Sequence, residues 1–423
     1  MLSRADITKC FIRYACLSNY NHVFPRNFYS NDQNKFSNDD PDNESSSENL
    51  LSIHRLKNPT SKVICPKQLR VAIIGAPNAG KSTLTNKILG WKVAPVSCKV
   101  HTTRFRTMGV FTEGDSQIVI LDTPGLIESG KLKRHNLEDS LLIDPHIALL
   151  EADLIAVTVD VSPIWYRSSL HSEIVKALHM HSNKRSILLL NKVDLLKNKN
   201  ELFKITKSLT GGIVDGRRDF AIRNSRKYPK ESVIKEINYN FPPLLMNDAG
   251  KADLESKDGW KAYNKRLQAV GNLTTSYWTK FERVFMLNSL EGDGIYDLKT
   301  YLLETAKAVD KWDYDETLVT NQSPYRLVKQ CVWEALLDSD LPAEIPYNIK
   351  IKIKVLTESE EDSLLRVGID LLCFNNRQLS GVIGNDGQKV ALIARKAKQN
   401  MMDTFKCDMS LKLAAKRITK KKT

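Results

Sequence analysis

The sequence has no long apolar run and few cysteines, and both absences narrow the class of protein. No uninterrupted apolar stretch approaches the roughly 18 residues needed to cross a bilayer, so no transmembrane segment is predicted. The seven cysteines stand at positions 10, 16, 65, 98, 331, 373 and 407, without a C-x-x-C pair. This pattern indicates neither a zinc site nor a disulfide framework, and it favours a reducing compartment.

Acidic residues are scarce at both ends of the chain, which carries a net charge of +14. Residues 377–423 contain twelve Lys or Arg and three Asp or Glu, a local excess of +9. A basic end favours a polyanion as partner, and the alternative is a solubilising tail. Residues 1–30 hold basic residues and a single acid, Asp6. This composition is typical of a mitochondrial presequence, the alternative being a disordered cytosolic tail.

Composition also divides the rest of the chain into segments. Residues 31–66 begin with a run of Asn, Asp, Ser and Glu, which predicts a disordered linker. From residue 67 apolar runs alternate with stretches of helical spacing. This alternation predicts an α/β domain at 67–310, with a mostly parallel sheet and helices on both faces. A polar, basic segment at 197–280 is interpreted as an insertion, whose Trp260 and Trp278 indicate some packed structure.

The elements of the α/β domain follow from the apolar runs. Residues 108–111 and 118–121 flank a Thr-Glu-Gly-Asp turn and predict an antiparallel hairpin. Ligands of such sheets bind beyond the carboxyl ends of the strands. The other expected strands are 69–74, 154–159, 187–190 and 284–287, and the expected helices are 81–90, 168–181 and 295–308.

A second, small α+β unit is predicted at 322–416, between a linker at 311–321 and a basic tail at 417–423. Ser323-Pro324 has the sequence of a helix start. A two-residue period follows, in which Ile349, Ile351, Ile353 and Val355 alternate with lysines. The period predicts a strand with one core face and one lysine-lined face. The expected order of elements is αββααβ.

A phosphate-binding loop is the clearest motif. Gly75-Ala76-Pro77-Asn78-Ala79-Gly80-Lys81-Ser82 lies between an expected strand and an expected helix. Its backbone N–H groups would surround a phosphate, with Lys81 on the outer phosphates and Ser82 on Mg²⁺. The alternative is an ordinary strand–turn–helix with two glycines. The residues predicted here to bind nucleotide are Gly75, Asn78, Ala79, Gly80, Lys81, Ser82 and Thr83.

Three later motifs each follow an expected strand. Asp122-Thr123-Pro124-Gly125 places a carboxylate for Mg²⁺ and a peptide N–H for the γ-phosphate. Asn191-Lys192-Val193-Asp194 places a carboxylate that accepts two N–H bonds from guanine and a lysine stem that covers the base. Ser289-Leu290-Glu291 offers backbone N–H groups to guanine O6. Singly each motif fits an ordinary turn, but in this order they predict GTP as the ligand.

With His101-Thr102-Thr103-Arg104, these motifs resemble the Era family of translation-factor-related GTPases. The resemblance implies that Ser82, Thr103 and Asp122 hold Mg²⁺ and that Lys81, Thr103 and Gly125 are catalytic. It also implies that Asn191, Lys192 and Asp194 read guanine. Leu126 stands where Ras-like enzymes place a water-orienting Gln, so hydrolysis is expected to be slow. Asn78 has two interpretations: it helps hold an activating K⁺, or it only shapes the turn.

The second unit resembles a type II KH domain. Of two overlapping G-x-x-G matches, the one at 384–387 is chosen because Val382 and Ile383 are apolar and expected in the core. Such a loop lets backbone N–H groups approach RNA phosphates. Asp386 departs from the basic residue common in such loops and would repel a phosphate. The residues implied to bind RNA are Gly384, Asn385, Asp386, Gly387, Lys389, Arg395, Lys396 and Lys398.

The chain as a whole resembles mitochondrial Era-like GTPases. This implies a GTP-hydrolysing RNA chaperone that binds small-subunit ribosomal RNA near its 3′ end. It would assist mitochondrial small-subunit assembly in the matrix, with peripheral association with the inner membrane as a further option. Two alternatives stay open: a mitochondrial GTPase acting on tRNA, and a nucleotide-binding scaffold that barely hydrolyses GTP.

Overall fold

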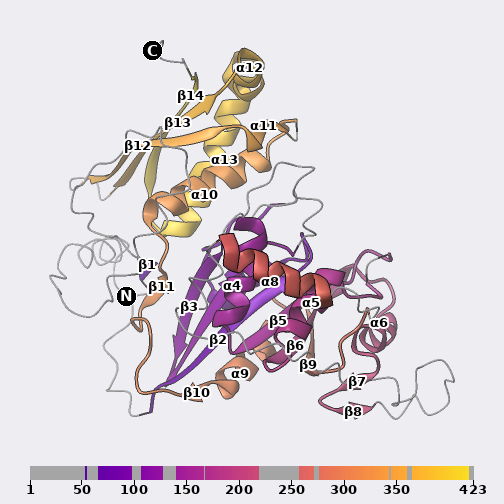
Figure 1. Ribbon diagram of the computed structural model, residues 1–423. Helices are drawn as coiled ribbons and strands as arrows, with labels where there is room; N and C mark the ends of the chain where they lie inside the picture. Colours follow the sequence, from indigo (N-terminus) through magenta and orange to yellow (C-terminus); the bar gives the residue numbers. More distant parts are fainter. Residues whose placement is uncertain are drawn as a thin grey trace.

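The structure is a computed structural model with two packed units (Figure 1). The predictions for residues 1–30, for most of the linker at 31–66, for Thr103 and for most of the tail at 417–423 concern residues outside the described ones. Within the described part, no helix combines the length and apolarity needed to cross a membrane. The described residues are 53–54, 65–97, 106–126, 140–165, 167–218, 257–270, 276–342, 344–359 and 364–418.

The first unit is built on a mostly parallel sheet with strand order β3-β4-β2-β5-β6-β9. β3 runs antiparallel to β4, which confirms the predicted hairpin. The remaining neighbours on this path are parallel, so their carboxyl ends meet at one edge. The strands are β2 (Lys67–Gly75), β3 (Thr107–Glu113), β4 (Ser116–Asp122), β5 (Leu154–Asp160), β6 (Arg185–Asn191) and β9 (Phe281–Leu287).

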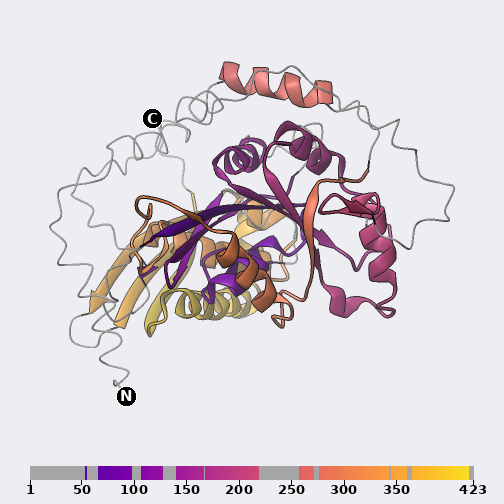
Figure 2. The same cartoon turned by 90° about the horizontal axis from the view of Figure 1, so that it is seen from below.

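Helices cover both faces of this sheet, as Figures 1 and 2 show. One face packs against α4, α5 and α6, and the other against α2 and α9. The predicted α/β fold class is therefore confirmed. The helices are α2 (Lys81–Leu89), α4 (Ser140–Glu151), α5 (Ser172–Met180), α6 (Glu201–Thr210) and α9 (Ile295–Thr305), with the short η2 (Val193–Leu195).

Two predicted helices are shorter in the structure. The first, expected at 168–181, begins at Ser172, where His171 in extended conformation accepts a hydrogen bond from Glu173 N and caps the helix. The second, expected at 295–308, ends at Thr305. Its last residues instead form β10 (Lys307–Ala308), which pairs antiparallel with the start of β2.

The segment at 197–280 is only partly an insertion. Leu202, Ile205 and Leu209 of α6 lie in the sheet core together with Trp278. α6 is followed by β7 (Ile213–Val214) and β8 (Arg217–Arg218). A further helix, α8 (Lys257–Val270), buries Tyr263 against α4 and α5. The prediction that the whole segment interrupts the fold was wrong, because its apolar residues complete one face of the sheet.

The second unit has a three-stranded sheet of order β12-β13-β14 with helices on one face. Ser323 Oγ accepts a hydrogen bond from Arg326 N, as expected of the helix start. The elements of the second unit follow the predicted order αββααβ, with one added turn of helix, α11. The elements are α10 (Pro324–Leu337), α11 (Glu344–Tyr347), β12 (Lys350–Ser359), β13 (Leu364–Cys373), α12 (Asn376–Ile383), η5 (Asn385–Gly387), α13 (Gln388–Phe405) and β14 (Met409–Arg417).

The predicted alternation along β12 breaks at its middle. Ile353 lies opposite Ile369, but Val355 lies opposite Gly368, so Lys354 is an extra residue in the ladder. This irregularity turns Val355 to the outer face, where its side chain is 45% exposed. The assignment of Val355 to the core was therefore wrong. A short strand before this unit, β11 (Leu318–Thr320), pairs with β1 (Ile53–His54).

Candidate nucleotide and RNA sites

The predicted phosphate loop connects β2 to α2. Gly80 caps α2 with a φ of +91°, and a Cβ there would collide with the Asn191 amide. Lys81, the first helical residue, is buried, and its Nζ donates to the carbonyls of Ala76 (2.9 Å) and Gly75 (3.3 Å). The ammonium group therefore lies against the loop itself, at the N-terminus of the helix, where an anion is favoured.

Ser82 and Asp122 come together beside Lys81. Ser82 Oγ donates to Asp122 Oδ2 at 2.7 Å, across the carboxyl ends of neighbouring strands. Asp122 is fully buried, and its Oδ1 has no hydrogen-bond partner among the described residues. A hydroxyl and a buried carboxylate with an unused oxygen are the hard donors that Mg²⁺ requires. The residues present fit that ion.

Burial also shifts the pKa values at this point. It raises the pKa of Asp122 to about 6, against the hydrogen bond from Ser82 and the charge of Lys81. It lowers the pKa of Lys81 to about 8, against the charge of Asp122. Both charged forms lack solvation here, so a bound cation beside Asp122 and a phosphate beside Lys81 would each be stabilised.

Gly125 brings the second motif against the phosphate loop. A Cβ at Gly125 would lie 2.7 Å from Pro77 N, so only glycine allows this approach. The next residue, Leu126, is buried and its N–H donates to Gly75 O at 3.1 Å. The Gly125 peptide is thus beside the predicted phosphate site. Thr103, the third predicted metal ligand, is outside the described residues and is not placed.

Asn191 joins three of the predicted motifs. Its Nδ2 donates to Ala79 O at 2.9 Å, and its Oδ1 accepts from Ser289 Oγ at 2.8 Å and Ser289 N at 3.1 Å. All of these groups are buried. Asn191 therefore holds the phosphate loop and the Ser289 loop in register, rather than pointing its own side chain at the ligand.

Lys192 is held in place by the phosphate loop and by a residue that the sequence analysis missed. Its Nζ donates to Asn78 O at 2.9 Å and to Asp160 Oδ2 at 2.6 Å. Asp160 is the last residue of β5. A carboxylate at the carboxyl end of a buried strand is a pattern from which the sequence could have predicted a site residue. Asn78 itself has a φ of +60°, a conformation that Asn tolerates better than most residues.

The predicted base-binding residues lie at the rim of the site. Asp194 in η2 is exposed, as is Leu290, while Ser289 is buried. Lys87 Nζ donates a hydrogen bond to the Leu290 carbonyl oxygen at 3.0 Å. A cavity of about 300 Å³ opens here and extends toward the second unit. Its lining comes from α2, the turn after it, the Ser289 loop and Lys406: Thr83, Asn86, Lys87, Gly90, Trp91, Lys92, Val96, Ser289, Leu290 and Lys406.

The predicted RNA loop lies between α12 and α13. Val382 is fully buried, which agrees with the choice of the second G-x-x-G match. Gly384 and Gly387 have φ of +70° and +78°, and between them Asn385 and Asp386 are exposed. The loop therefore presents its backbone to solvent, as close contact with a phosphate requires.

The predicted basic residues of α13 differ in their surroundings. Arg395 and Lys398 are exposed. Lys396 Nζ instead donates to Asp338 O at 2.9 Å, and Lys389 Nζ lies 3.5 Å from Asp340 O. These two lysines help cap the turn after α10. The four predicted basic residues therefore form two pairs, one exposed and one bonded to the turn.

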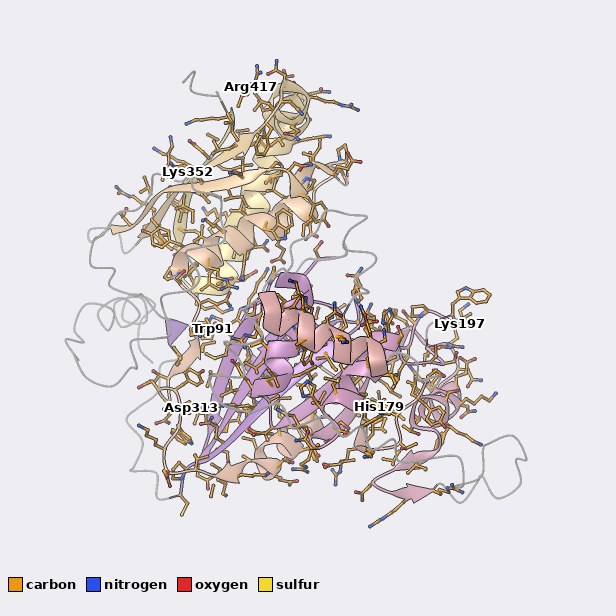
Figure 3. All side chains as sticks on the ribbon, in the orientation of Figure 1. Trp91, His179, Lys197, Asp313, Lys352 and Arg417 are labelled. Atoms are coloured by element: carbon orange, nitrogen blue, oxygen red, sulfur yellow. The ribbon has the colours of Figure 1, made fainter. Side chains whose placement is uncertain are left out.

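The residues that follow α2 and lead toward Thr103 are hydrogen-bonded to the second unit, and no sequence pattern indicated this contact. Trp91 Nε1 donates to Thr404 O at 2.7 Å. Lys92 Nζ donates to Glu334 Oε1 at 3.0 Å and to Asn400 Oδ1 at 2.8 Å. Figure 3 shows Trp91 where the two units meet. The side chain of Glu334 is only 7% exposed, so this ion pair is largely removed from water.

Comparisons with known proteins identify relatives of this chain. A family model described as 50S ribosome-binding GTPase matches residues 70–192. GTPase Era, mitochondrial, of Danio rerio is 41% identical over 350 residues, which cover 83% of this chain and 75% of the relative. The Salmo salar protein of the same name is 40% identical over 361 residues, covering 83% and 76%.

Among solved structures, Era in complex with MgGDPNP and nucleotides 1506–1542 of 16S ribosomal RNA is similar to this chain. The TM-score is 0.57 at 23% identity, over 84% of this chain and 95% of that one. At this identity the likeness supports the fold, including a KH unit after the GTPase domain. The relatives that are about two-fifths identical over most of their length show the family as well as the fold. On that evidence, the chain belongs to the mitochondrial GTPase Era family.

Proposed function

We propose that this GTPase binds small-subunit ribosomal RNA near its 3′ end and assists assembly of the mitochondrial small ribosomal subunit in the matrix. One observation carries the proposal. The exposed glycine loop belongs to a unit whose helices α10 and α13 hydrogen-bond directly to Trp91 and Lys92, beside the nucleotide site. The Era structure that is similar to this chain was solved with 16S ribosomal RNA, which agrees with the same ligand class.

The nucleotide chemistry follows from the residues in place. Mg²⁺, when bound, neutralises phosphate charge. Ser82 and Asp122 would hold it, and Thr103 is proposed as the third protein ligand. Lys81 would balance the outer phosphates, while the Gly125 peptide N–H would meet the γ-phosphate. Asp194 would accept the guanine N–H groups, and the Lys192 stem would cover the base.

Leu126 makes hydrolysis slow in this proposal. The side chain is apolar and buried, so it does not orient an attacking water. Asn78 supports K⁺ activation only if its side chain is used, because its backbone conformation and carbonyl already serve the turn. Turnover measured in K⁺ and in Na⁺ buffers separates the two roles of Asn78. Equal rates in both would reject the K⁺ role.

The γ-phosphate would change RNA binding through the residues after α2. Binding of the γ-phosphate by Thr103 would move Lys92, which precedes Thr103 along the chain and is paired with Glu334 of α10. GTP would therefore bias the arrangement of the two units, and hydrolysis would time release of the RNA. This is a coupling between two sites, so RNA should change nucleotide affinity by the same factor.

The direct test has two arms. The affinity of the full chain for an RNA of the small-subunit 3′ end is measured with a non-hydrolysable GTP analogue and with GDP. Crosslinking in cells then identifies the bound RNA by sequencing. Different affinities and a peak on small-subunit RNA are expected. Reads concentrated on tRNA would favour the tRNA alternative, and affinities blind to the nucleotide would reject the coupling.

A nucleotide-binding scaffold remains the second candidate, because Leu126 leaves the water position without a polar side chain from that residue. No GTP turnover in either K⁺ or Na⁺ buffer, with RNA present, would favour it.

Peripheral association with the inner membrane is a further proposal. Salt extraction of the protein from isolated membranes tests it, since a peripheral protein is released with its ionic contacts.

A further inference from the structure

The cavity of about 300 Å³ beside the base site is lined in part by the second unit. Thr83, Asn86, Lys87 and Gly90 line it from α2, at the three- and four-residue spacing of one helix face. With a rise of about 1.5 Å per residue, the cavity follows α2 for roughly 10 Å from the end that carries the phosphate loop. Among the described residues that line it, Lys406 alone belongs to the second unit.

The lysines that line this cavity differ in what their ammonium groups bond. Lys87 Nζ donates to the Leu290 carbonyl oxygen at 3.0 Å, and Lys92 Nζ donates to two side chains of the second unit. Among the described residues, no acceptor is bonded to the ammonium group of Lys406, whose Nζ lies 5.8 Å from the centroid of the Trp91 ring. Lys406 is exposed, so its donors are available to a ligand in the cavity.

The backbone of Lys406 is fixed where the two units meet. Its N–H donates to Met402 O at 2.8 Å and its φ is +55°, a left-handed conformation that ends α13. Just before it, Thr404 O accepts from Trp91 Nε1 at 2.7 Å, and Phe405 packs against the core of the first unit. The lysine stem is flexible, but it extends from a point that these contacts hold beside the cavity.

The position of the cavity indicates which part of a nucleotide would meet Lys406. Thr83 directly follows Ser82, so one end of the cavity adjoins the proposed phosphate and Mg²⁺ site. Ser289 and Leu290, whose N–H groups are predicted to meet guanine O6, line the cavity as well. A guanosine nucleotide that reaches both places must lay its ribose between them. The ribose hydroxyl oxygens are then the acceptors nearest to the second unit.

We propose that Lys406 donates a hydrogen bond to the ribose hydroxyls of the bound nucleotide, so that the second unit completes the nucleotide site. The inference rests on the proposed placement of the phosphates and the base, and it does not depend on RNA. Lys406 then makes the protein select ribonucleotides over deoxyribonucleotides. Because GTP and GDP share the ribose, either nucleotide holds the second unit against the first. This contact differs from the Lys92 pair, which responds to the γ-phosphate.

The test is isothermal titration of the full chain, without RNA, with GDP and with 2′,3′-dideoxy-GDP. The wild type should bind GDP roughly 5- to 10-fold more tightly than the dideoxy nucleotide. In Lys406→Met the GDP affinity should fall by about that factor, while the dideoxy-GDP affinity stays unchanged. Lys406→Arg, which keeps a cation, should retain part of the preference. Lys412→Met, at an exposed position on β14, is the control and should behave as the wild type.

Three outcomes would overturn the inference. The first is a preference for GDP over dideoxy-GDP that is the same in Lys406→Met and in the wild type. The second is an equal loss of affinity for both nucleotides in Lys406→Met, which would show that the lysine acts through the fold and not through the ribose. The third is the same loss in Lys412→Met, which would indicate net charge alone. Failure of the wild type to bind either nucleotide would instead reject the proposed nucleotide site.

Discussion

At the residue scale, the most informative contacts are those that hold a side chain away from the ligand. Asn191 was predicted to read guanine, but its amide is used on both sides, by Ala79 O and by Ser289. Asp194, three residues later, is exposed and is the carboxylate available to the base. Base selection should therefore depend on Asp194, and the integrity of the site on Asn191.

Changing Asp194→Asn should exchange the preferred base. The Asp194 carboxylate accepts hydrogen bonds from two guanine N–H groups. The amide of the variant replaces one of these acceptors with a donor, which cannot bond to an N–H group. Affinity for GTP should fall by roughly 100-fold or more, while xanthosine triphosphate, which has an oxygen at that position, should bind better than GTP. Isothermal titration with both nucleotides measures this. Asp310→Asn, at an exposed position outside the site, is the control, and equal GTP binding by the two variants would contradict the assignment.

At the element scale, short turns at the ends of strands and helices position the sites. The loop between α12 and α13 presents Asn385 and Asp386, and Asp386 has a φ of +48°. The exposed Asp386 carboxylate belongs to the loop that we propose binds phosphate, so we expect its charge to weaken the clamp that the glycines form. The extra residue in β12, Lys354, also changes the direction of its neighbours. It turns Val355 outward and brings Lys354 to Asp370.

Changing Asp386→Asn should strengthen RNA binding by roughly three- to tenfold at moderate salt, because it removes a negative charge beside a phosphate. Asn tolerates the left-handed backbone conformation, so the loop should keep its shape. Filter binding of a single-stranded RNA measures the change. Asp403→Asn on α13 should have little effect. Affinity that is unchanged or weaker in Asp386→Asn would show that the carboxylate does not face the bound phosphate.

At the scale of the whole molecule, the two units meet through the residues that follow α2. Trp91 and Lys92 bond to α10 and α13, and Gln322 Nε2 donates to Val93 O at 3.0 Å. The interface therefore lies between the nucleotide site and the RNA unit. Its central ion pair, Lys92 with Glu334, is largely buried, and such a pair makes the arrangement of the units specific more than it makes it stable.

Lys92→Met should uncouple the two sites. In the wild type we expect RNA affinity to differ between the GTP-analogue and GDP states by a factor in the range of roughly 5 to 150. In the variant this ratio should fall toward 1, with nucleotide affinity in the absence of RNA retained. Lys311→Met, an exposed lysine in the linker, should keep the wild-type ratio. A full ratio in Lys92→Met would show that coupling runs through another contact.

Stability should depend on pH through Glu334. Burial raises the pKa of Glu334 to about 7 against the charge of Lys92, whereas the ordinary value is 4.5. Between these values the folded state holds a proton that the unfolded state lacks. The free energy of unfolding therefore falls as pH rises from about 5 to 7, by up to roughly 2–3 kcal/mol.

Glu334→Gln should remove this component, so the variant should lose less stability than the wild type between pH 5 and pH 8. Urea unfolding of both proteins at the two pH values measures the difference, which also cancels the contribution of Asp122. Glu304→Gln, an exposed position on α9, is the control. Identical pH dependence in the wild type and Glu334→Gln would show that Glu334 titrates in the ordinary range.

The sequence alone determined the parts of this protein that depend on neighbouring residues. The phosphate loop, the strand-end motifs, the hairpin and the start of α10 are all readable, because a turn, a cap or a two-residue period is a local property. The KH order and the choice of the 384–387 loop followed from the same kind of pattern, since Val382 had to be buried.

Only the tertiary structure decided which distant groups share an environment. The sequence did not reveal that Lys92 pairs with Glu334, that Asp160 holds Lys192, or that α6 completes the sheet core. It also placed Val355 in the core, which one extra residue in the ladder prevents. These features depend on packing between segments far apart along the chain. A side chain's burial and charge partners are set there, and no local pattern records them.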